Sequence, residues 1–462
     1  MPMADEGVGD SRRTAVVVIH GMGEQRPLET LRRFIGTALP SIDGRRMYFS
    51  RPDKVSDSFE ARRFLAPAQE GIYGQSEFFE YHWSYMMKGN KLADLLPTVR
   101  RILLQLPTNV PPGLRVVWFA LWAILAWALA TISGTWAGGG LPSFAWKSIT
   151  NVLFGGAAWL VVAVAGLLGT ILTKSFVDVI RYLDTSPRSY EARRDIRAGI
   201  VELLQGLHDS GRYSRVVVVA HSLGAFIAYD AITYLWAQMN KLHGGPVDAV
   251  PPEPLEDLAA LEAIVTAGVP DIDAYQNAQW KLWLAHRRQR NPWLITDFIS
   301  VGTPMYMADQ LFTRSRTEFD RRVDSREMAV TPPRNDGEFV EVADAAANFG
   351  WYNRGREVLY YGAPFAVTRW TNLWFPPILS FFGDIFGGPL RPLFGNGIRD
   401  VQVLGNRPGR FLPGFAHARY FLYPDSLGEQ DVATLLRAAL QLNVDDELAG
   451  LPTKPAVAEE TR

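Results

Sequence analysis

Two short runs of β-branched residues stand out in the hydrophobic pattern of this chain, Thr14–Ile19 (TAVVVI) and Arg215–Ala220 (RVVVVA). Continuous apolar runs of this length are typical of strands that are buried on both faces of a sheet. The other segments that the pattern predicts to be strands are Phe78–Trp83, Leu294–Val301, Phe365–Phe375 and Arg419–Tyr423.

Residues at helical spacing occur between most of these strands. The segments predicted to be helices are Leu28–Leu39, Tyr190–Leu207, Ala225–Met239, Trp280–Arg290 and Gln430–Leu442. The charged stretch 316–350 is predicted to be a loop. Strands that alternate with helices favour an α/β fold, namely a doubly wound, mostly parallel sheet with helices on both faces.

Two longer apolar runs, Val116–Ser133 and Val152–Thr173, contain no charged residue. Because about 20 apolar residues suffice for a helix to cross a bilayer, residues 114–173 are predicted to form a transmembrane helical hairpin. A pair of buried core helices is the alternative. Basic residues flank the outer ends: Arg100, Arg101 and Arg115 before the hairpin, and Lys174, Arg181, Arg188, Arg193 and Arg194 after it. Since only Lys147 lies between the runs, the rest of the chain is expected on the cytoplasmic side.

The hairpin divides the chain into expected parts. Residues 14–113 and 174–442 would together form one α/β domain, with an insertion at about 240–275 that is rich in Pro and Gly and then acidic. Residues 443–462 are expected to be a disordered tail. The first fourteen residues contain no apolar core of a signal peptide, so no secretory signal is expected.

The composition argues against several classes of function. The chain has 47 Lys and Arg against 48 Asp and Glu, without the basic excess that nucleic-acid phosphates require. It has no cysteine, which rules out disulfides, thiolate metal sites and a cysteine nucleophile. Its seven histidines show no H-E-x-x-H spacing, and no G-x-x-x-x-G-K-[ST] loop is present. No metal and no cofactor are therefore expected.

The strongest chemical motif is Ala220-His221-Ser222-Leu223-Gly224, a variant of the G-x-S-x-G nucleophile elbow. It lies between an apolar strand and an apolar helix, where a strained turn exposes the serine hydroxyl. Small residues on either side of the serine let neighbouring backbone approach. The helix N-terminus favours the negative charge that develops during nucleophilic attack. The alternative is a serine that only caps the helix.

Two further motifs accompany the elbow, HGMG at residues 20–23 and GTP at residues 302–304. Together with aspartate and histidine residues late in the chain, they resemble the motifs of α/β-hydrolase lipases and esterases. The resemblance covers residues 14–83 and 174–442, and the elbow and the His-Gly turn are its specific parts. It implies an α/β-hydrolase fold and a Ser-His-Asp triad that cleaves esters. Residues 114–173 have no counterpart in the simple soluble members.

Ester hydrolysis passes through an oxyanion, which needs two backbone N–H donors fixed in advance. The resemblance implies that Leu223, the residue after the serine, supplies one donor and that Met22 in the early turn supplies the other. Gly21 and Gly23 would free this backbone to point its N–H groups inward. The alternative is an ordinary glycine turn in which His20 caps the strand.

The general base must be a histidine that follows Ser222, because the chain order of this fold is serine, acid, histidine. Three histidines qualify. His243 lies in the Pro/Gly-rich insertion, and His286 lies among arginines, as on a solvated helix face. His417, in a loop next to a predicted strand, is therefore the predicted base.

The acid is expected in a loop after the penultimate strand. Asp384 lies in such a loop (GDIFGG), which is similar to the D-x-x-G-G loops of related lipases. Asp400 is the second candidate and Asp309 the third, and a turn-forming aspartate is the alternative for each. In the predicted mechanism His417 removes the Ser222 proton, Asp384 orients the histidine, and water hydrolyses the acyl-enzyme.

The sequence thus predicts a membrane-anchored serine hydrolase whose partners are a lipid bilayer and a lipid-like acyl ester. Two other classes remain open. One is a membrane scaffold that keeps the hydrolase fold without turnover, and the other is a thioesterase or amidase that uses the same triad. The sequence does not specify the acyl chain length or the oligomeric state.

Overall fold

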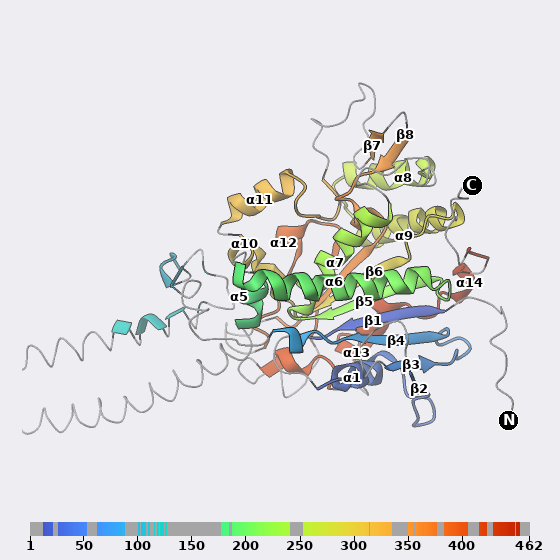
Figure 1. The fold of residues 1–462 in the computed structure, drawn as a ribbon, viewed down its shortest axis with the longest axis horizontal. Helices are drawn as coiled ribbons and strands as arrows, with labels where there is room; N and C mark the ends of the chain where they lie inside the picture. Colours follow the sequence, from blue (N-terminus) through green and yellow to red (C-terminus); the bar gives the residue numbers. More distant parts are fainter. Residues whose placement is uncertain are drawn as a thin grey trace, which may run out of the picture.

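The computed structural model describes residues 13–21, 26–52, 62–87, 100–101, 103–107, 110, 115, 118–119, 121–123, 125–126, 177–183, 187–240, 253–313, 315–334, 350–353, 356–376, 383–404, 415–422, 428–448 and 450–452. These residues form an eight-stranded sheet that is covered by helices, and a separate two-stranded hairpin (Figure 1). The sheet is mostly parallel, so the predicted α/β class is confirmed.

The strand order in the main sheet is β10-β9-β6-β5-β1-β4-β3-β2. Its strands are β1 Thr14–Ile19, β2 Phe49–Pro52, β3 Arg62–Ala66, β4 Ser76–Tyr81, β5 Arg215–His221, β6 Ile295–Val301, β9 Arg369–Trp374 and β10 Ile398–Gln402. Neighbours from β10 to β4 pair in parallel, whereas β3 pairs antiparallel with both β4 and β2. Strands β1 and β6 are buried along their whole length, as strands covered on both faces must be.

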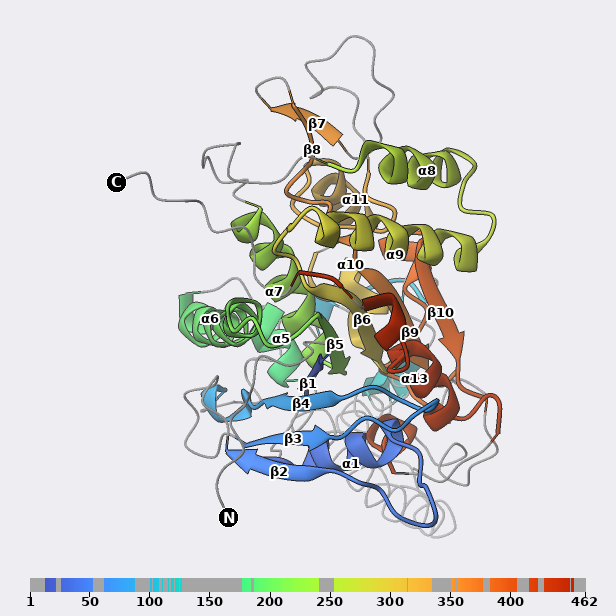
Figure 2. The same ribbon diagram turned by 90° about the vertical axis from the view of Figure 1, so that its right-hand side faces the viewer.

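The side chains of β1 alternate between two apolar cores. Val17 and Ile19 pack in the core beneath α6, α7 and α9, and Val16 and Val18 pack in the core beneath α1 and α13. Figure 2 shows α6 and α13 on opposite sides of the sheet. The helices are α1 Glu29–Ala38, α5 Val177–Leu183, α6 Pro187–Asp209, α7 Gly224–Met239, α8 Leu255–Thr266, α9 Ile272–Arg288, α10 Ala308–Leu311, α11 Arg316–Asp324, α12 Arg391–Phe394, α13 Val432–Leu440 and α14 Asp445–Leu448.

The carboxyl ends of the parallel strands meet at one edge of the sheet. Ile19 at the end of β1 lies level with Tyr81 in β4 and with Ala220 in β5. Along the chain the sheet grows from β1 toward β4 and then, from β5 onward, in the other direction. Open α/β sheets bind ligands at the carboxyl ends of strands beside such a reversal. The elbow after β5 is located at this point.

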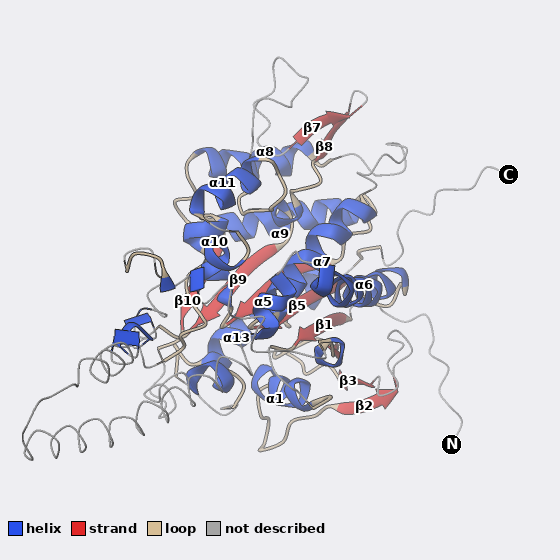
Figure 3. Ribbon diagram, turned by 60° about the vertical axis from the view of Figure 1, so that its left-hand side comes forward, coloured by secondary structure: helices blue, strands red, loops and turns tan. Residues whose placement is uncertain are grey.

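The hairpin of β7 Gly350–Asn353 and β8 Arg356–Leu359 lies apart from the main sheet, near α8 (Figure 3). Helix α8 corresponds to the acidic helix expected in the insertion, and it packs against α9. The hairpin and α8 therefore lie outside the layers that position the elbow.

The structure differs from the sequence prediction at several elements, among them strands β2, β3 and β10, which were not predicted. The predicted strand Arg419–Tyr423 is wrong, because Phe415–Arg419 forms the 3₁₀ helix η9 and residues 420–422 continue as turn and bend. Tyr420 and Phe421 are buried, so their apolar character reflects packing of an irregular segment. The stretch 316–350 begins with helix α11, whose start is capped by Ser315.

The predicted membrane localisation with two transmembrane spans is corrected. Within the described ranges no helix is long and apolar enough to cross a membrane. A spanning helix needs about 20 mostly apolar residues. Helix α6 reaches 23 residues, but charged side chains occur along its whole length. Most of Val116–Ser133 and all of Val152–Thr173 lie outside the described residues.

Candidate active site

Ser222 lies in the sharp turn between β5 and α7, at the carboxyl edge of the sheet. Its φ is +55°, a left-handed conformation that residues with a β-carbon rarely adopt. The Ser222 N–H donates to the carbonyl oxygen of Val301 in β6 at 2.9 Å, which fixes the turn to the neighbouring strand. Strained backbone of this kind persists where the surrounding structure enforces it, and it occurs most often at functional sites.

Glycines allow the backbone to approach Ser222 from two sides. A β-carbon on Gly224 would lie 2.6 Å from the Ile19 carbonyl oxygen, so α7 begins directly against the end of β1. A β-carbon on Gly21 would lie 2.9 Å from the Ser222 β-carbon. Neither contact leaves room for a larger residue. The His-Gly turn and the elbow, 200 residues apart in sequence, are therefore in direct contact.

The structure brings together the three residues predicted for the triad. His417 Nε2 lies 2.8 Å from Ser222 Oγ, and His417 Nδ1 lies 3.0 and 3.1 Å from the two carboxylate oxygens of Asp384. His417 comes from η9, after β10, and Asp384 comes from the loop between β9 and β10. With the proton on Nδ1, His417 donates to Asp384 and presents a basic Nε2 to the serine hydroxyl.

The Asp384 carboxylate is fully buried and accepts hydrogen bonds from several sides. Besides His417, the Tyr420 hydroxyl donates to Oδ2 at 2.7 Å and the Phe386 N–H donates to Oδ1 at 2.8 Å. Burial alone would raise the pKa of Asp384, but the charge of His417 and these hydrogen bonds outweigh it and hold the pKa below its usual value. The group therefore stays an anion beside the histidine.

Two glycines shape the cavity around this carboxylate. A β-carbon on Gly302 would lie 2.9 Å from Asp384 Oδ2, and one on Gly387 would lie 2.6 Å from it. Gly302 also has a φ of +55°, which favours glycine. Gly302 of the GTP motif and Gly387, the first of two adjacent glycines, thus both leave space for the Asp384 side chain.

His221, inside the elbow, holds the loop of the catalytic histidine. Its Nε2–H donates to the carbonyl oxygen of His417 at 2.9 Å, and the two rings are 4.9 Å apart. Burial and the neighbouring His417 lower the pKa of His221 to about 3, so it stays neutral. The sequence interpretation gave no role to His221 or Tyr420. For His221 the signal was its place in the elbow, whereas nothing in the sequence distinguished Tyr420.

One of the two predicted oxyanion donors can be located. Leu223 begins the turn into α7, and no acceptor for its N–H occurs in the described part of the chain. Met22 lies outside the described residues. His20, two residues before Met22, is buried, with Nδ1 2.9 Å from the Gly21 carbonyl oxygen, and its Nε2 accepts the Trp83 N–H at 3.2 Å. His20 thus anchors the backbone on which the second donor was predicted.

The two alternative acids are occupied elsewhere. Asp400 accepts the backbone N–H groups of Leu390 and Arg391 at the start of α12, the latter at 2.8 Å, and the Asn372 amide at 2.7 Å. Burial raises the pKa of Asp400 despite these bonds. Asp309 lies in the first turn of α10. Neither has a contact with His417 among the hydrogen bonds and ion pairs of the described residues.

The interpretation of His286 as part of a solvated helix face is wrong. The side chain is buried on α9, and its Nε2 lies 2.7 Å from the buried carboxylate of Glu253. Arg287 beside it is buried as well. The neighbouring arginines suggested an exposed helix face. This part of α9 is instead covered by α8 and by the segment before α8. His243 lies outside the described residues.

In the described ranges no group of three or more His, Asp or Glu side chains could hold a metal ion. No family model, curated protein or solved structure matches the chain. The chemistry of this site therefore has to follow from the geometry around Ser222.

Proposed function

We propose that this chain is a serine hydrolase of the α/β-hydrolase type, which cleaves carboxylic esters through an acyl-enzyme. The observation that carries the proposal is the continuous hydrogen-bonded series from Asp384 through His417 to Ser222, with the serine in a strained turn. A helix cap would need neither the histidine at 2.8 Å nor a buried carboxylate behind it. The combination is the one that nucleophilic catalysis by serine requires.

The proposed reaction follows from these positions. His417 Nε2 takes the proton as Ser222 Oγ attacks the acyl carbonyl, and Asp384 stabilises the imidazolium that forms. The Leu223 N–H and the N-terminus of α7 stabilise the oxyanion, with the Met22 N–H proposed as the second donor. The imidazolium returns its proton to the leaving alcohol. Water then attacks the acyl-enzyme by the same steps and releases the acid.

The order of the elements supports the hydrolase-type fold within the α/β class. The nucleophile follows the central strand β5, the acid follows β9, the histidine follows β10, and one antiparallel strand, β3, lies near the far edge. This is the arrangement expected when the chain order is serine, acid, histidine.

An apolar acyl group is the substrate we propose for this site. The ring of Phe386 lies 5.0 Å from that of His417, and the ring of Phe421 lies 5.9 Å from that of His221. Aromatic side chains beside a few polar groups are typical of pockets for apolar ligands. A lipid-like acyl ester therefore fits better than a charged one.

Ser222→Ala tests the proposal. The wild type should react with a fluorophosphonate and hydrolyse p-nitrophenyl esters, and the variant should lose labelling and about 10⁴-fold or more in kcat. Exposed Ser325→Ala is the matched control and should behave as the wild type. Failure of the wild type to label would favour a scaffold without turnover. Profiling with esters, thioesters and amides of increasing acyl length separates the remaining classes.

A further inference from the structure

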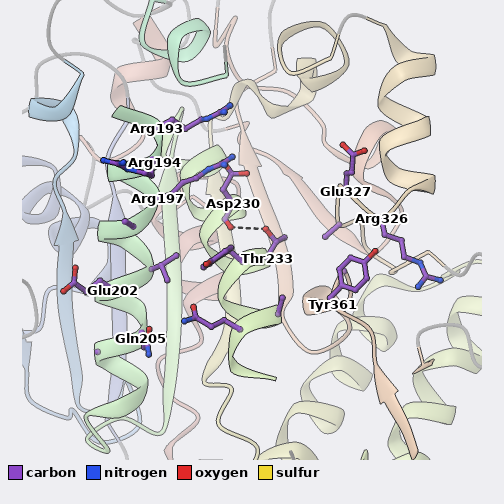
Figure 4. A pocket seen from close by; sticks show the side chains of 18 of the residues that line it. Arg193, Arg194, Arg197, Glu202, Gln205, Asp230, Thr233, Arg326, Glu327 and Tyr361 are labelled. Atoms are coloured by element: carbon purple, nitrogen blue, oxygen red, sulfur yellow. Dashed lines mark hydrogen bonds and ion pairs between the residues drawn. The ribbon is translucent and has the colours of Figure 1, made fainter. Parts of the chain in front are cut away.

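A hollow of about 990 Å³ lies between α6, α7 and two loop segments, Arg326–Ala329 and Tyr361–Gly362 (Figure 4). No triad residue lines it. Pockets for small molecules span roughly 300–1,000 Å³, so this hollow is at the upper end of that range. The hollow runs along α6 and α7, and its size and elongated shape suit an extended ligand.

One end of the hollow carries guanidinium groups from α6, whereas the guanidinium of Arg326 packs on the Tyr360 ring, 4.6 Å from its centroid. Arg193 and Arg197 lie four residues apart on one side of α6, and Arg326 lies on the opposite wall (Figure 4). Arg197 forms an ion pair with Asp230. No carboxylate of the described residues lies within ion-pair distance of Arg193. This end can therefore accept a further anion.

The acidic residues at this end have partners within the protein. Asp230 accepts the Tyr182 hydroxyl at 2.8 Å in addition to Arg197. Glu327 lies 3.9 Å from Arg322 and accepts the Ser325 hydroxyl. Glu202 and Asp209 also line the hollow and have no ion pair within the described part of the chain. They lie farther along α6 than Arg193, by nine and sixteen residues, or about 14 and 24 Å.

Exposed tyrosines surround the same hollow. Tyr190, Tyr234 and Tyr361 are 56%, 58% and 36% exposed, respectively. Tyrosine and arginine are the side chains most enriched at binding hot spots. Gln205 and Gln238 also line the hollow, and their amides can pair with peptide backbone. Such a surface suits a polypeptide better than a compact anion.

We propose that this groove binds an extended acidic peptide segment of a partner protein. Its carboxylates lie against Arg193, its backbone bonds to Gln205 and Gln238, and its apolar side chains pack on the tyrosines. Charge complementarity places the acidic end of the peptide at the arginine end of the groove, because Glu202 and Asp209 repel it from the other end. The site is independent of the esterase reaction.

Fluorescence polarisation tests the proposal with two labelled nonapeptides of equal composition. One has its glutamates grouped at one end, followed by tyrosine, serine and glycine, and the other has its glutamates distributed evenly. We expect the grouped peptide to bind more tightly and to weaken as salt is raised. Arg193→Ala and Tyr234→Ala should each reduce its affinity about tenfold. Arg33→Ala is the matched control, since Arg33 is an exposed arginine on α1, on the other face of the sheet.

Each other outcome overturns the proposal. Equal affinity of both peptides, or of wild type and Arg193→Ala, would show that the groove does not read a grouped acidic segment. Competition by millimolar inorganic phosphate, without any peptide binding, would make it a site for small anions. Self-association in sedimentation that Tyr234→Ala abolishes, again without peptide binding, would make a second copy of the chain the occupant.

Discussion

Two aspartates near the edge of the sheet, the buried Asp384 and the half-buried Asp400, differ in the hydrogen bonds that their oxygens accept. Asp384 receives the His417 imidazole and the Tyr420 hydroxyl, whereas Asp400 receives the backbone N–H groups of Leu390 and Arg391. The first set of partners orients a side chain at the serine. The second fixes the start of α12 and has no connection to Ser222 through described contacts.

Asp384→Asn should therefore reduce kcat for ester hydrolysis by about 10³–10⁴-fold, because an amide does not hold the His417 tautomer. Asp400→Asn should retain most of the activity and instead lower the free energy of unfolding, because it weakens backbone hydrogen bonds. Initial rates and urea unfolding of both purified variants check this pair. If Asp400→Asn proved the more damaging to kcat, the acid would be misassigned.

At the scale of elements, the start of α1 depends on a carboxyl group from β4. Glu80 Oε2 accepts the N–H of Leu28, the residue before the helix, whose φ is +65°. Burial raises the pKa of Glu80 to about 7, although bonds from Leu28 and Leu31 and the charge of Arg32 oppose the shift. A raised pKa means that the folded protein binds this proton more tightly than the unfolded chain does.

The stability contributed by this proton is present below about pH 4.5 and is lost as the pH rises to about 7. Glu80→Gln keeps an oxygen that accepts the Leu28 N–H but does not titrate. The free energy of unfolding of the variant, relative to that of the wild type, should therefore increase between pH 5 and pH 8, as measured by urea unfolding. Glu29→Gln on the exposed face of α1 is the control. Parallel curves for wild type and Glu80→Gln would contradict the assignment.

Elements with a continuous run of apolar residues could be predicted from the sequence, because the run itself indicates that the element is buried. The valine runs of β1 and β5 are buried, the apolar helix α7 is buried over most of its surface, and their patterns show it. Strand β10, with charged residues in a partly exposed edge position, has no such pattern. The transmembrane prediction relied on the apolar length of two uncharged runs and on the basic residues that flank them, and no helix within the described ranges is long and apolar enough to cross a membrane.

The same reasoning applies to the candidate site. Ser222, His417 and Asp384 lie in motifs or loops that chain order singles out, so their positions could be predicted. The supporting contacts could not, because Tyr420 and His221 act through partners that are distant in sequence. His286 was misinterpreted for a related reason, since its cover comes from another segment.

At the scale of the whole molecule, three histidines are held neutral, His20 and His208 in the interior and His221 half-buried at the elbow. Burial lowers the pKa of His20 to about 3, of His208 to about 4 and of His221 to about 3. His208 illustrates the cause, because its Nδ1 donates to the Leu204 carbonyl at 2.7 Å and its Nε2 accepts the Leu294 N–H at 3.0 Å. A proton on Nε2 would remove that acceptor and place a charge in the core.

These shifts predict a steep loss of stability in acid. In the unfolded chain the histidines titrate near pH 6.5, so their contribution is fully present above that pH and is lost as the pH falls toward 3–4. At pH 5 each fully buried histidine should lower the free energy of unfolding by about 2 kcal/mol relative to pH 8. Urea unfolding at both pH values measures the sum, which the opposing contribution of Glu80 offsets only in part. Histidine proton resonances identify the groups, since three of the seven should not titrate above pH 4.5. A flat stability profile together with ordinary titration of all seven would mean that these histidines are open to solvent, and the anchoring roles assigned to His20 and His221 would then be wrong.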